Sequence, residues 1–511
     1  MTAVRPCRLL RVGRGGSVAL CTLLSACNLA PPYHRPAAAI PPSFKEAPGW
    51  RSAAPADAVA KGQWWLLFDD PVLNQLEARV AINNQNVAAA AAAYDQARAA
   101  VREVRASLFP TIDLSGSATR AGSFGGATPI IIGGTGGTTG TTGGTGTGTG
   151  AGTGTGSTTG TTTTVTNGSG SRRYSLSIGA SWEPDLWGSI RNGIRQQGAL
   201  AAATQADLNN ATLSAQGELA LNYVQLRGLE AQKAILDATV RAYTRALTIT
   251  NNRYTQGVIA KVDVLQAQSQ LTTAQANAAD LVRQRSAFEH AIGVLVGENP
   301  ATFVLPEQAW NRAVPDIPAT LPSALLERRP DVAAAERRVA AANAAIGIQR
   351  AAFFPSLSLS SSVGANSSSL STLFDAASSI WSLGLRGALT LLDFGARSAR
   401  VAQARAAYQQ TAASYRQTVL ISFQQVEDQL AAVQVLAYVG NQRVTAAQAA
   451  NQVEALTQNQ YLAGQIAYTD VITAQTTALS ARQAEATAVV NRQVAAVTLI
   501  QAIGGSWTTA P

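Results

Sequence analysis

Residues 106–117 read ASLFPTIDLSGS, and residues 351–362 read AAFFPSLSLSSS, 245 positions later. Each copy ends an alanine-rich stretch with helical spacing and contains a proline, Pro110 or Pro355. From the proline onward polar and apolar residues alternate, so the period of the pattern falls from about 3.6 residues to 2. The sequence therefore predicts the same helix-to-strand junction twice in one chain.

Four segments show this alternation, two after each junction. Strands of about ten residues that are apolar on one face and polar on the other are typical of a water-filled barrel spanning a membrane. A half-buried sheet of a soluble protein has the same alternation and is the alternative. Aromatic residues near the strand ends favour the barrel, because such residues form girdles at membrane surfaces. They are Phe109, Tyr174, Trp182, Phe353, Phe354, Trp381 and Phe394.

The N-terminus has the pattern of a secretory signal. Four arginines, at positions 5, 8, 11 and 14, precede the apolar stretch Val18–Leu24. The following Leu24-Ser25-Ala26-Cys27 resembles a bacterial lipobox, which predicts cleavage before Cys27 and lipid attachment to its sulfur. Cleavage at an ordinary signal-peptidase site is the alternative. Asn28 stands where an aspartate is associated with inner-membrane retention, so the outer membrane is favoured.

Other chemistry has little support in the mature chain. Cys7 and Cys21 leave with the signal, so Cys27 stands alone and no intrachain disulfide is possible. The formal charge falls from +9 to +5 and is spread along helices, which argues against nucleic-acid binding. His34 and His290 have no metal-ligand spacing, and neither a catalytic triad nor a phosphate loop is present. We therefore predict no metal, no catalytic residue and no cofactor except the lipid on Cys27.

The segment after the lipid anchor, residues 27–60, is rich in proline and alanine and predicts an extended tether. The pair Trp64-Trp65 follows, for which packing is the favoured role and ligand stacking the alternative. Asp70 and Pro71 have the order of a helix cap and a first-turn proline. They start one predicted helix that runs to Ser107.

Residues 121–171 contain no charged residue and are dominated by glycine and threonine. Such a tract buries too little apolar surface to offset its ordering entropy, so it predicts a long disordered loop between the first two strands. A tolerated low-complexity insertion is the favoured interpretation. An adhesive or phage-receptor role is the alternative.

The helical patterns are unusually long. Asp185–Asn299 contains no proline, and the part from Gly188 to Thr255 alone would form a helix of about 100 Å. A helix of this length is unexpected in a compact domain but suits a coiled-coil tunnel. The pattern breaks at Tyr254–Leu265, which matches Tyr461–Ile472 at a constant offset of 207. The helical hairpin is therefore repeated as the strand pair is, and this internal repeat defines the fold.

Two stretches carry a family resemblance that covers nearly the whole mature chain. LPSALLERRPDV at 321–332, continuing to Phe353-Phe354-Pro355-Ser356, is the more specific, and the segment from Trp64 to Asn74 is the other. They resemble the TolC-type outer-membrane factors, in particular the NodT-like lipoprotein branch of tripartite efflux pumps. The resemblance implies a homotrimer in which four strands per chain close a twelve-stranded transmembrane β-barrel. A twelve-helix periplasmic α-barrel with an equatorial domain continues it. Four strands alone would leave open edges in lipid, so trimerisation agrees with the physics.

The resemblance also assigns a periplasmic gate. In the family, an aspartate of the first helical hairpin bonds a tyrosine of the second, and these positions match Asp263 and Tyr461. A further aspartate after the second turn matches Asp470. Asp263 and Asp470 also suit helix N-caps, since each follows a turn where a carboxylate can accept free backbone amides. The cap and gate roles are compatible.

The hairpin turns that meet the adaptor protein in the family match Gly257, Val258, Gly464 and Gln465. Two other positions depart from the family pattern. Ile466 replaces a basic latch residue and Thr473 replaces an acidic ring residue. The resemblance therefore implies a gate that depends less on ion pairs.

The predicted function is a passive, non-enzymatic exit duct for drugs or other small molecules across the outer membrane. Its expected partners are two further copies of the chain, a periplasmic adaptor protein, an inner-membrane RND-type transporter and outer-membrane lipid. A duct for type I protein secretion is one rival, and a surface adhesive or structural protein displaying the Gly/Thr loop is another. An enzyme on a helical scaffold is the least favoured. Lipidation and the NodT-like segments favour drug efflux.

The segments predicted along the chain follow from these patterns. They are a signal peptide over 1–26, a lipidated tether over 27–60, an equatorial segment with the first tunnel helix over 61–107, a β-hairpin with its loop over 108–184, a long helical hairpin over 185–299, an equatorial connector over 300–323, a helix over 324–352, a second β-hairpin over 353–393, a second long helical hairpin over 394–504 and a C-terminal tail over 505–511.

Overall fold

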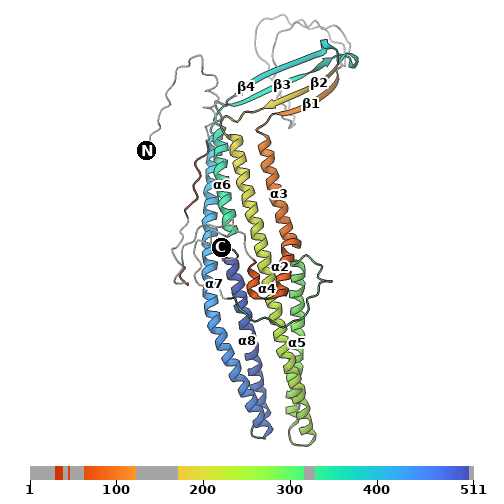
Figure 1. Ribbon diagram of the computed structural model, residues 1–511, viewed down its shortest axis with the longest axis vertical. Helices are drawn as coiled ribbons and strands as arrows, with labels where there is room; N and C mark the ends of the chain where they lie inside the picture. Colours follow the sequence, from red (N-terminus) through yellow and green to blue (C-terminus); the bar gives the residue numbers. More distant parts are fainter. Residues whose placement is uncertain (1–28, 38–43, 47–62, 122–170, 316–328, 506–511) are drawn as a thin grey trace, which may run out of the picture. The chain divides into compact units, whose positions relative to one another are not determined.

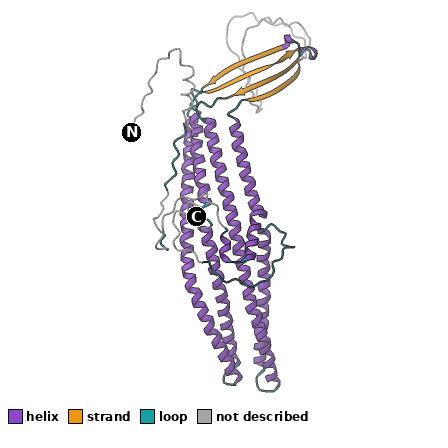
Figure 2. Ribbon diagram, in the orientation of Figure 1, coloured by secondary structure: helices purple, strands orange, loops and turns teal. Residues whose placement is uncertain are grey.

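The computed structural model describes residues 29–37, 44–46, 63–121, 171–315 and 329–505. The predicted signal peptide, the lipidation site Cys27 and nearly all of the Gly/Thr loop lie outside the described residues. The chain divides into two units, of which the smaller comprises Ser107–Pro184 and Pro355–Ala388. In Figure 2 the larger unit consists mainly of long helices and the smaller unit of strands.

Two helical hairpins of equal length dominate the helical unit (Figure 1). α4 (Ser189–Thr255) is followed by α5 (Lys261–Leu295), and α7 (Ala396–Leu462) is followed by α8 (Tyr468–Ala502). The first helix of each hairpin has 67 residues and the second has 35. The hairpins therefore repeat each other in length as well as in sequence. The long helix predicted between Gly188 and Thr255 is confirmed.

Three shorter helices complete this unit: α2 (Pro71–Asn83), α3 (Gln85–Ala106) and α6 (Pro330–Ala351). α4 is the central helix, because it packs against α2, α3, α5, α6 and α8, while α6 also packs against α7. Many of the buried positions on α4 and α6 are alanines, whose small side chains let neighbouring helices approach closely. Among the described residues, no helix is both long and apolar enough to cross a bilayer.

The single helix predicted from Pro71 to Ser107 is wrong in one respect, because Asn84 divides it into α2 and α3. The Asn84 side-chain oxygen accepts the backbone N–H groups of Asn86 and Val87 and so caps α3. Its Nδ2 donates to the Leu295 carbonyl at the end of α5, at 2.8 Å. Local side-chain hydrogen bonds of this kind compete with a continuous helix. Here the same side chain also forms a tertiary bond to the end of α5.

The largest apolar cluster involves α2, α4, α5 and α8. The short 3₁₀ turn Trp64–Phe68 places Trp64, Trp65 and Phe68 inside it, with edge-on contacts between the rings. Large aromatic side chains contribute a disproportionate share of buried apolar area. The packing role predicted for the tryptophan pair is confirmed.

The sheet unit has four antiparallel strands in the order β1-β2-β3-β4. They are β1 (Thr111–Ala121), β2 (Ser171–Trp182), β3 (Ser356–Ser367) and β4 (Ser379–Ala388). The register places residues of like polarity opposite each other, as in the pairs Ser115 with Ser177 and Leu114 with Ile178. The predicted number of strands and their alternation are confirmed, because one face carries the polar residues and the other the apolar ones.

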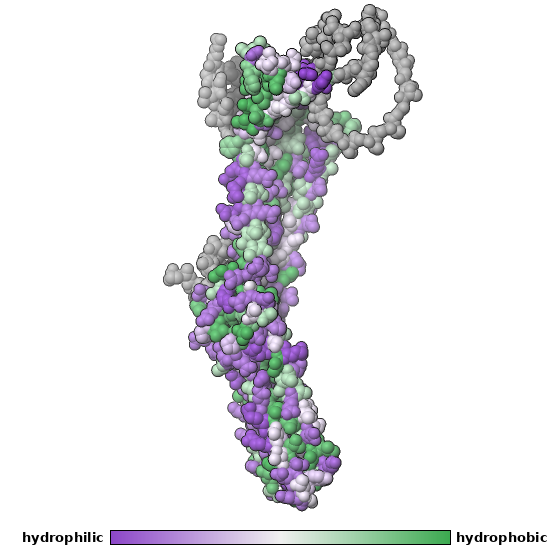
Figure 3. All heavy atoms as spheres, turned by 90° about the vertical axis from the view of Figure 1, so that its right-hand side faces the viewer, coloured by the Kyte–Doolittle hydropathy of each residue, from purple (hydrophilic) through white to green (hydrophobic). Residues whose placement is uncertain are grey.

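The apolar face of the sheet is uncovered in a single chain. Ile112 is 74% exposed and Leu385 is 69% exposed. In Figure 3 hydrophobic residues gather over the strands, and hydrophilic residues cover much of the visible surface of the helical unit. β1 and β4 are the two ends of the strand order, so each has one edge without a partner strand among the described residues.

Residues 29–37, named here the N-terminal strap, belong to the segment predicted as an extended tether, and in the structure they lie against α6 and α7. Alternate residues from Leu29 to Ala37 make hydrogen bonds to these helices, as expected for an extended chain. The carbonyls of Leu29 and Pro31 accept from Arg350 and Asn343, and the Tyr33 hydroxyl donates to Glu336. These three partners are spaced seven residues apart on α6. Farther along, Arg35 donates to Tyr415, and Arg416 donates to the Ala37 carbonyl.

Candidate functional site

Both helical hairpins turn through the same backbone path. In each turn, the N–H groups of the glycine and the next residue bond back to the preceding helix at 2.9 Å. Gly257 and Gly464 have φ values of 74° and 75°, a left-handed conformation that glycine adopts without a Cβ clash. Together with Val258 and Gln465 they are exposed. The four residues predicted to meet an adaptor are therefore accessible in the single chain.

Tyr461 lies in a buried cluster where the α7–α8 hairpin packs against the α4–α5 hairpin. The Tyr468 ring is 5.3 Å from it, and the Arg253 guanidinium lies over its face at 4.9 Å from the ring centroid. Ala267 of α5 is buried in the same cluster. A cation over an aromatic face contributes about 0.5–2 kcal/mol, depending on its exposure. The cluster therefore joins the two hairpins next to their turns.

The predicted hydrogen bond between Asp263 and Tyr461 is not formed within the chain, because the buried Tyr461 hydroxyl has no hydrogen-bond partner. The tyrosine that Asp263 influences is Tyr468. Burial is the main cause that raises the pKa of Tyr468, a hydrogen bond with Thr250 opposes the shift, and the charge of Asp263 adds to it. Asp263 itself is half-buried in the first turn of α5.

Asp470 caps α8, since its carboxylate accepts the Ala467 N–H at 3.2 Å. It also lines a groove between α7 and α8 with a volume of about 470 Å³. Ile466 and Thr473, the two departures from the family pattern, line the same groove. Asp470 is the single charged residue among its lining residues.

The two tips differ in environment although their turns match. Tyr254 and Tyr461 occupy equivalent positions of the repeat, but Tyr254 is 39% exposed and Tyr461 is 8% exposed. Two residues surround Tyr461. Tyr468 follows it just after the hairpin turn, whereas Arg253 comes from the other hairpin, more than 200 positions earlier. Sequence reasoning missed both, because the only local signal was an arginine before one turn and a tyrosine after the other.

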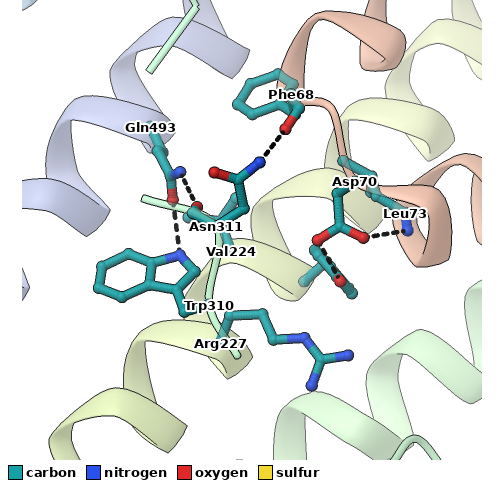
Figure 4. Close-up of a pocket in the computed structure, with 9 residues that line it drawn as sticks. Phe68, Asp70, Leu73, Val224, Arg227, Trp310, Asn311 and Gln493 are labelled. Carbon is teal, nitrogen blue, oxygen red and sulfur yellow. Dashed lines mark hydrogen bonds between the residues drawn. The ribbon is translucent and has the colours of Figure 1, made fainter. Parts of the chain in front are cut away.

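A second polar site holds the connector after α5 against α2, α4 and α8 (Figure 4). Asn311 donates to the Phe68 carbonyl at 2.9 Å, and Gln493 donates to the Asn311 carbonyl at 2.8 Å. Trp310 donates its indole N–H to Gln493 at 3.1 Å. On the other side of this site, the Tyr223 hydroxyl donates to Asp70 at 2.6 Å.

Buried charges strengthen this attachment. Glu230 accepts from Arg227 at 2.7 Å and from Arg285 at 2.8 Å. Arg227 also donates to the Pro306 carbonyl and Arg285 to the Leu305 carbonyl. A buried ion pair offsets its desolvation only with such additional hydrogen bonds. These residues are structural, and their sequence positions did not reveal them.

The polar face of the sheet is lined by small hydroxyl side chains. Hydroxyl pairs bridge neighbouring strands at 2.8–2.9 Å in Thr111–Ser181, Ser115–Ser177, Ser117–Ser175 and Ser362–Ser382. Serine satisfies its hydroxyl across the strands while projecting little from the sheet. This face can therefore border water without filling the space in front of it.

Comparisons with known proteins agree with this architecture. The family model described as "Outer membrane efflux protein" matches residues 78–298 and 321–505. The "Probable efflux pump outer membrane protein TtgC" of Pseudomonas putida is 27% identical over 488 residues, which cover 95% of this chain and 94% of the relative. The "Cation efflux system protein CusC" of Escherichia coli is 27% identical over 509 residues, covering 98% of this chain and 99% of the relative.

Solved structures have the same fold. The outer-membrane channel OprN covers 94% of this chain and 100% of its own, with 27% identity and a TM-score of 0.78. The CmeC outer membrane channel of Campylobacter jejuni covers 94% of this chain and 95% of its own, with 21% identity and a TM-score of 0.79. The second likeness concerns the fold only.

The family match spans both repeats, and its members are not enzymes. They are outer-membrane channels with a periplasmic extension, close to the NodT-type lipoproteins, and the family implies a trimeric component of a tripartite pump. The repeated hairpins, the four-stranded sheet and these matches lead to one conclusion: the chain belongs to the outer membrane efflux protein family and is an outer-membrane efflux channel of the TolC type.

Proposed function

We propose that three copies of the chain form a passive exit duct, and the observation that carries this proposal is the open sheet. In the part of the chain that the structure describes, its apolar face is uncovered, and β1 and β4 each have one edge without a partner strand. Unpaired backbone groups are not tolerated in lipid, so the edges must close on other copies. Four strands from each of three chains would give a twelve-stranded barrel with the serine-rich face toward water.

Small molecules are the proposed cargo. TtgC and ArpC of Pseudomonas putida are named for efflux pumps, in the second case for antibiotics, and CusC is named for cation efflux. The hydroxyl-lined sheet face carries few charged side chains, which suits a duct that selects little among small solutes. The proposed partners are a periplasmic adaptor and an inner-membrane RND-type transporter, which supply selectivity and energy.

The proposed gate of this duct lies at the tips of the two helical hairpins. Tyr461 holds the second hairpin against the first through Arg253, while Asp263 and Asp470 lie at the starts of the helices that follow the two turns. Release of this contact would let the α7–α8 hairpin move away from α4. The exposed turns at Gly257, Val258, Gly464 and Gln465 are the proposed adaptor contacts.

Two measurements test the assembly and its function. The purified protein in detergent should have a mass of three chains and should form channels in planar bilayers. In a host without its own efflux channel, the chain expressed with a cognate adaptor and transporter should lower susceptibility to small toxic compounds. A monomeric mass, or secretion of a protein with unchanged susceptibility, would contradict the proposal.

Cross-linking tests the adaptor contact. Cys27 is expected to be acylated and to be the single cysteine of the mature chain, so an introduced cysteine is the only free thiol. Gln465→Cys should cross-link to the adaptor. Val435→Cys, an exposed position within α7, is the matched control and should not. Equal cross-linking at both positions would exclude docking at the turn.

A further inference from the structure

A cavity of about 300 Å³ lies beneath the N-terminal strap, between α4 and α6. It shares no lining residue with the groove between α7 and α8 at Asp470, or with the polar site around Asn311 that holds the connector after α5. The residues that define its chemistry are Pro31 and Tyr33 of the strap, Asn192 and Arg195 of α4, and Asn343 and Ala344 of α6.

Asn192, one of the residues that line the cavity, has a hydrogen-bond donor without an acceptor. Asn192 is 0% exposed, and its Oδ1 accepts from Nη1 of Arg195 at 3.3 Å. Its Nδ2 is buried and has no hydrogen-bond partner. A buried donor left without a partner costs about 1–3 kcal/mol. An acceptor supplied by a ligand would remove this cost.

A positive charge lies beside this amide. Arg195, an exposed residue of α4 whose guanidinium donates to Asn192, is the single charged residue among the lining residues, and no carboxylate of the described residues forms an ion pair with it. The arginine one turn earlier, Arg191, is already paired with Asp185 at 3.0 Å. Guanidinium and amide donors together match the oxygens of a phosphate or carboxylate.

Apart from Tyr33 and Asn343, whose side chains donate to Glu336 and to the Pro31 carbonyl, the remaining lining residues are apolar. Pro31, Ala199, Ala340 and Ala344 contribute hydrocarbon surface and no side-chain polar group. A ligand with one anionic end and an apolar body therefore matches both the donors and the apolar lining residues. Free inorganic phosphate would match the donors alone.

The position along the chain indicates where such a ligand comes from. The strap begins with Leu29, whose carbonyl accepts from Arg350 in the last turn of α6. Cys27 precedes Leu29 by two residues, which is about 7 Å of chain at most. An acylated Cys27, as proposed above, would hold its lipid chains in the inner leaflet within reach of this part of α6. The phospholipid headgroups of that leaflet would then be the nearest source of an anionic ligand with an apolar body.

We propose that this cavity binds the phosphate headgroup of an anionic phospholipid, with Arg195 and Asn192 as donors and the strap as its outer wall. The bound lipid would hold the strap on α4 and α6. The site thereby fixes the helical unit relative to the leaflet in which the Cys27 lipid is anchored.

Native mass spectrometry of the purified full-length protein tests this site, with dioctanoyl-phosphatidylglycerol as the probe. Wild-type protein should retain the lipid, and Arg195→Gln and Asn192→Leu should each retain at least about five-fold less. Arg245→Gln is the matched control, because Arg245 is an exposed arginine on the same helix far from the cavity. Ala344→Phe should also lose the lipid by filling the apolar part, and wild-type-like melting temperatures would show that the variants fold.

Inorganic phosphate distinguishes the two sources of the anion. Phosphatidylglycerol binding that 10 mM phosphate does not displace supports the lipid site. Full displacement by phosphate overturns the lipid assignment in favour of a free anion. Equal retention by wild type, Arg195→Gln and Arg245→Gln overturns the site. Because the assay measures binding and not export or acylation, its failure leaves the proposed duct untouched and separates the two proposals.

Discussion

The Asp70 carboxylate caps α2 and at the same time accepts a 2.6 Å hydrogen bond from the Tyr223 hydroxyl of α4. One residue thus starts a short helix and ties it to α4, one of the two longest helices of the unit. Tyr223→Phe removes the tie and leaves the cap, whereas Asp70→Ala removes both. We expect about 1 kcal/mol of destabilisation for the first and about 2–3 kcal/mol for the second.

Thermal unfolding followed by circular dichroism measures both losses. Tyr254→Phe is the control. This substitution also removes a tyrosine hydroxyl from α4, but at an exposed position. If Asp70→Ala had the same melting temperature as Tyr254→Phe, the stabilising role of the Asp70 carboxylate would be contradicted.

Glu77 predicts a pH dependence of stability. It is fully buried on α2, and neither of its oxygens has a hydrogen-bond partner. Burial therefore raises the pKa of Glu77 well above its ordinary value of 4.5. Between the ordinary and the raised pKa the folded protein holds a proton that the unfolded chain has lost, so stability falls as pH rises through this window.

The test is the melting temperature of wild type and of Glu77→Gln from pH 5 upward. The glutamine variant keeps the shape without a titrating proton, so its advantage over wild type should grow with pH. Glu103→Gln, at an exposed position of α3, should leave the wild-type pH dependence unchanged. A constant difference between wild type and Glu77→Gln would show that Glu77 does not titrate in this range.

From the buried cluster around Tyr461 we predict which substitutions open the channel. Tyr461→Ala and Arg253→Gln remove the ring or the cation that joins the hairpins, and each should raise the open probability in planar bilayers about five-fold for a loss of about 1 kcal/mol. Tyr461→Phe should behave like wild type, because the Tyr461 hydroxyl has no partner within the chain. Arg241→Gln, an exposed arginine on the same helix, is the control.

Two results would change this view of the gate. A Tyr461→Phe channel that leaks as much as Tyr461→Ala would mean that the hydroxyl acts across a subunit boundary. An Asp263→Asn channel that leaks while Arg253→Gln does not would restore the predicted aspartate as the gate residue. Unchanged conductance in all four variants would place the gate elsewhere.

The close approach of the N-terminal strap to Gly347 of α6 should help to hold the strap in place. A Cβ at this position of α6 would lie 2.7 Å from the Ala30 Cβ and 2.7 Å from Nδ2 of Asn192. Gly347→Val should therefore displace the strap and expose it to limited proteolysis, which can be followed by mass spectrometry of the N-terminal fragment. Gly198→Ala is the control, since a Cβ there meets nothing within 4 Å. Equal cleavage rates would mean that the strap does not depend on this close approach.

Cys27→Ser tests the lipid anchor. The variant should carry no palmitate after metabolic labelling, whereas wild type should be labelled, because the thiol is the attachment atom. The serine variant should still reach the periplasm through the same signal. Label that persists in Cys27→Ser would refute lipidation at this residue.

Much of the architecture follows from local patterns in the chain. The change of period at Pro110 and Pro355 predicts the ends of α3 and α6 and the starts of β1 and β3. The repeat at Tyr254 and Tyr461 predicts two hairpins with the same turn. These features depend on neighbours in sequence, so composition and spacing carry them.

Contacts between distant residues required the tertiary structure. Asn84 divides a pattern that is locally continuous, because its side chain bonds the end of α5. Tyr461 is buried and Tyr254 exposed although they are equivalent in the repeat, because only Tyr461 meets Arg253. The sequence alone therefore determined the order and periods of the elements, through interactions that act over a few residues. The tertiary structure decided which copy of each repeated feature is buried and paired, because burial and pairing depend on side chains brought together from hundreds of positions apart.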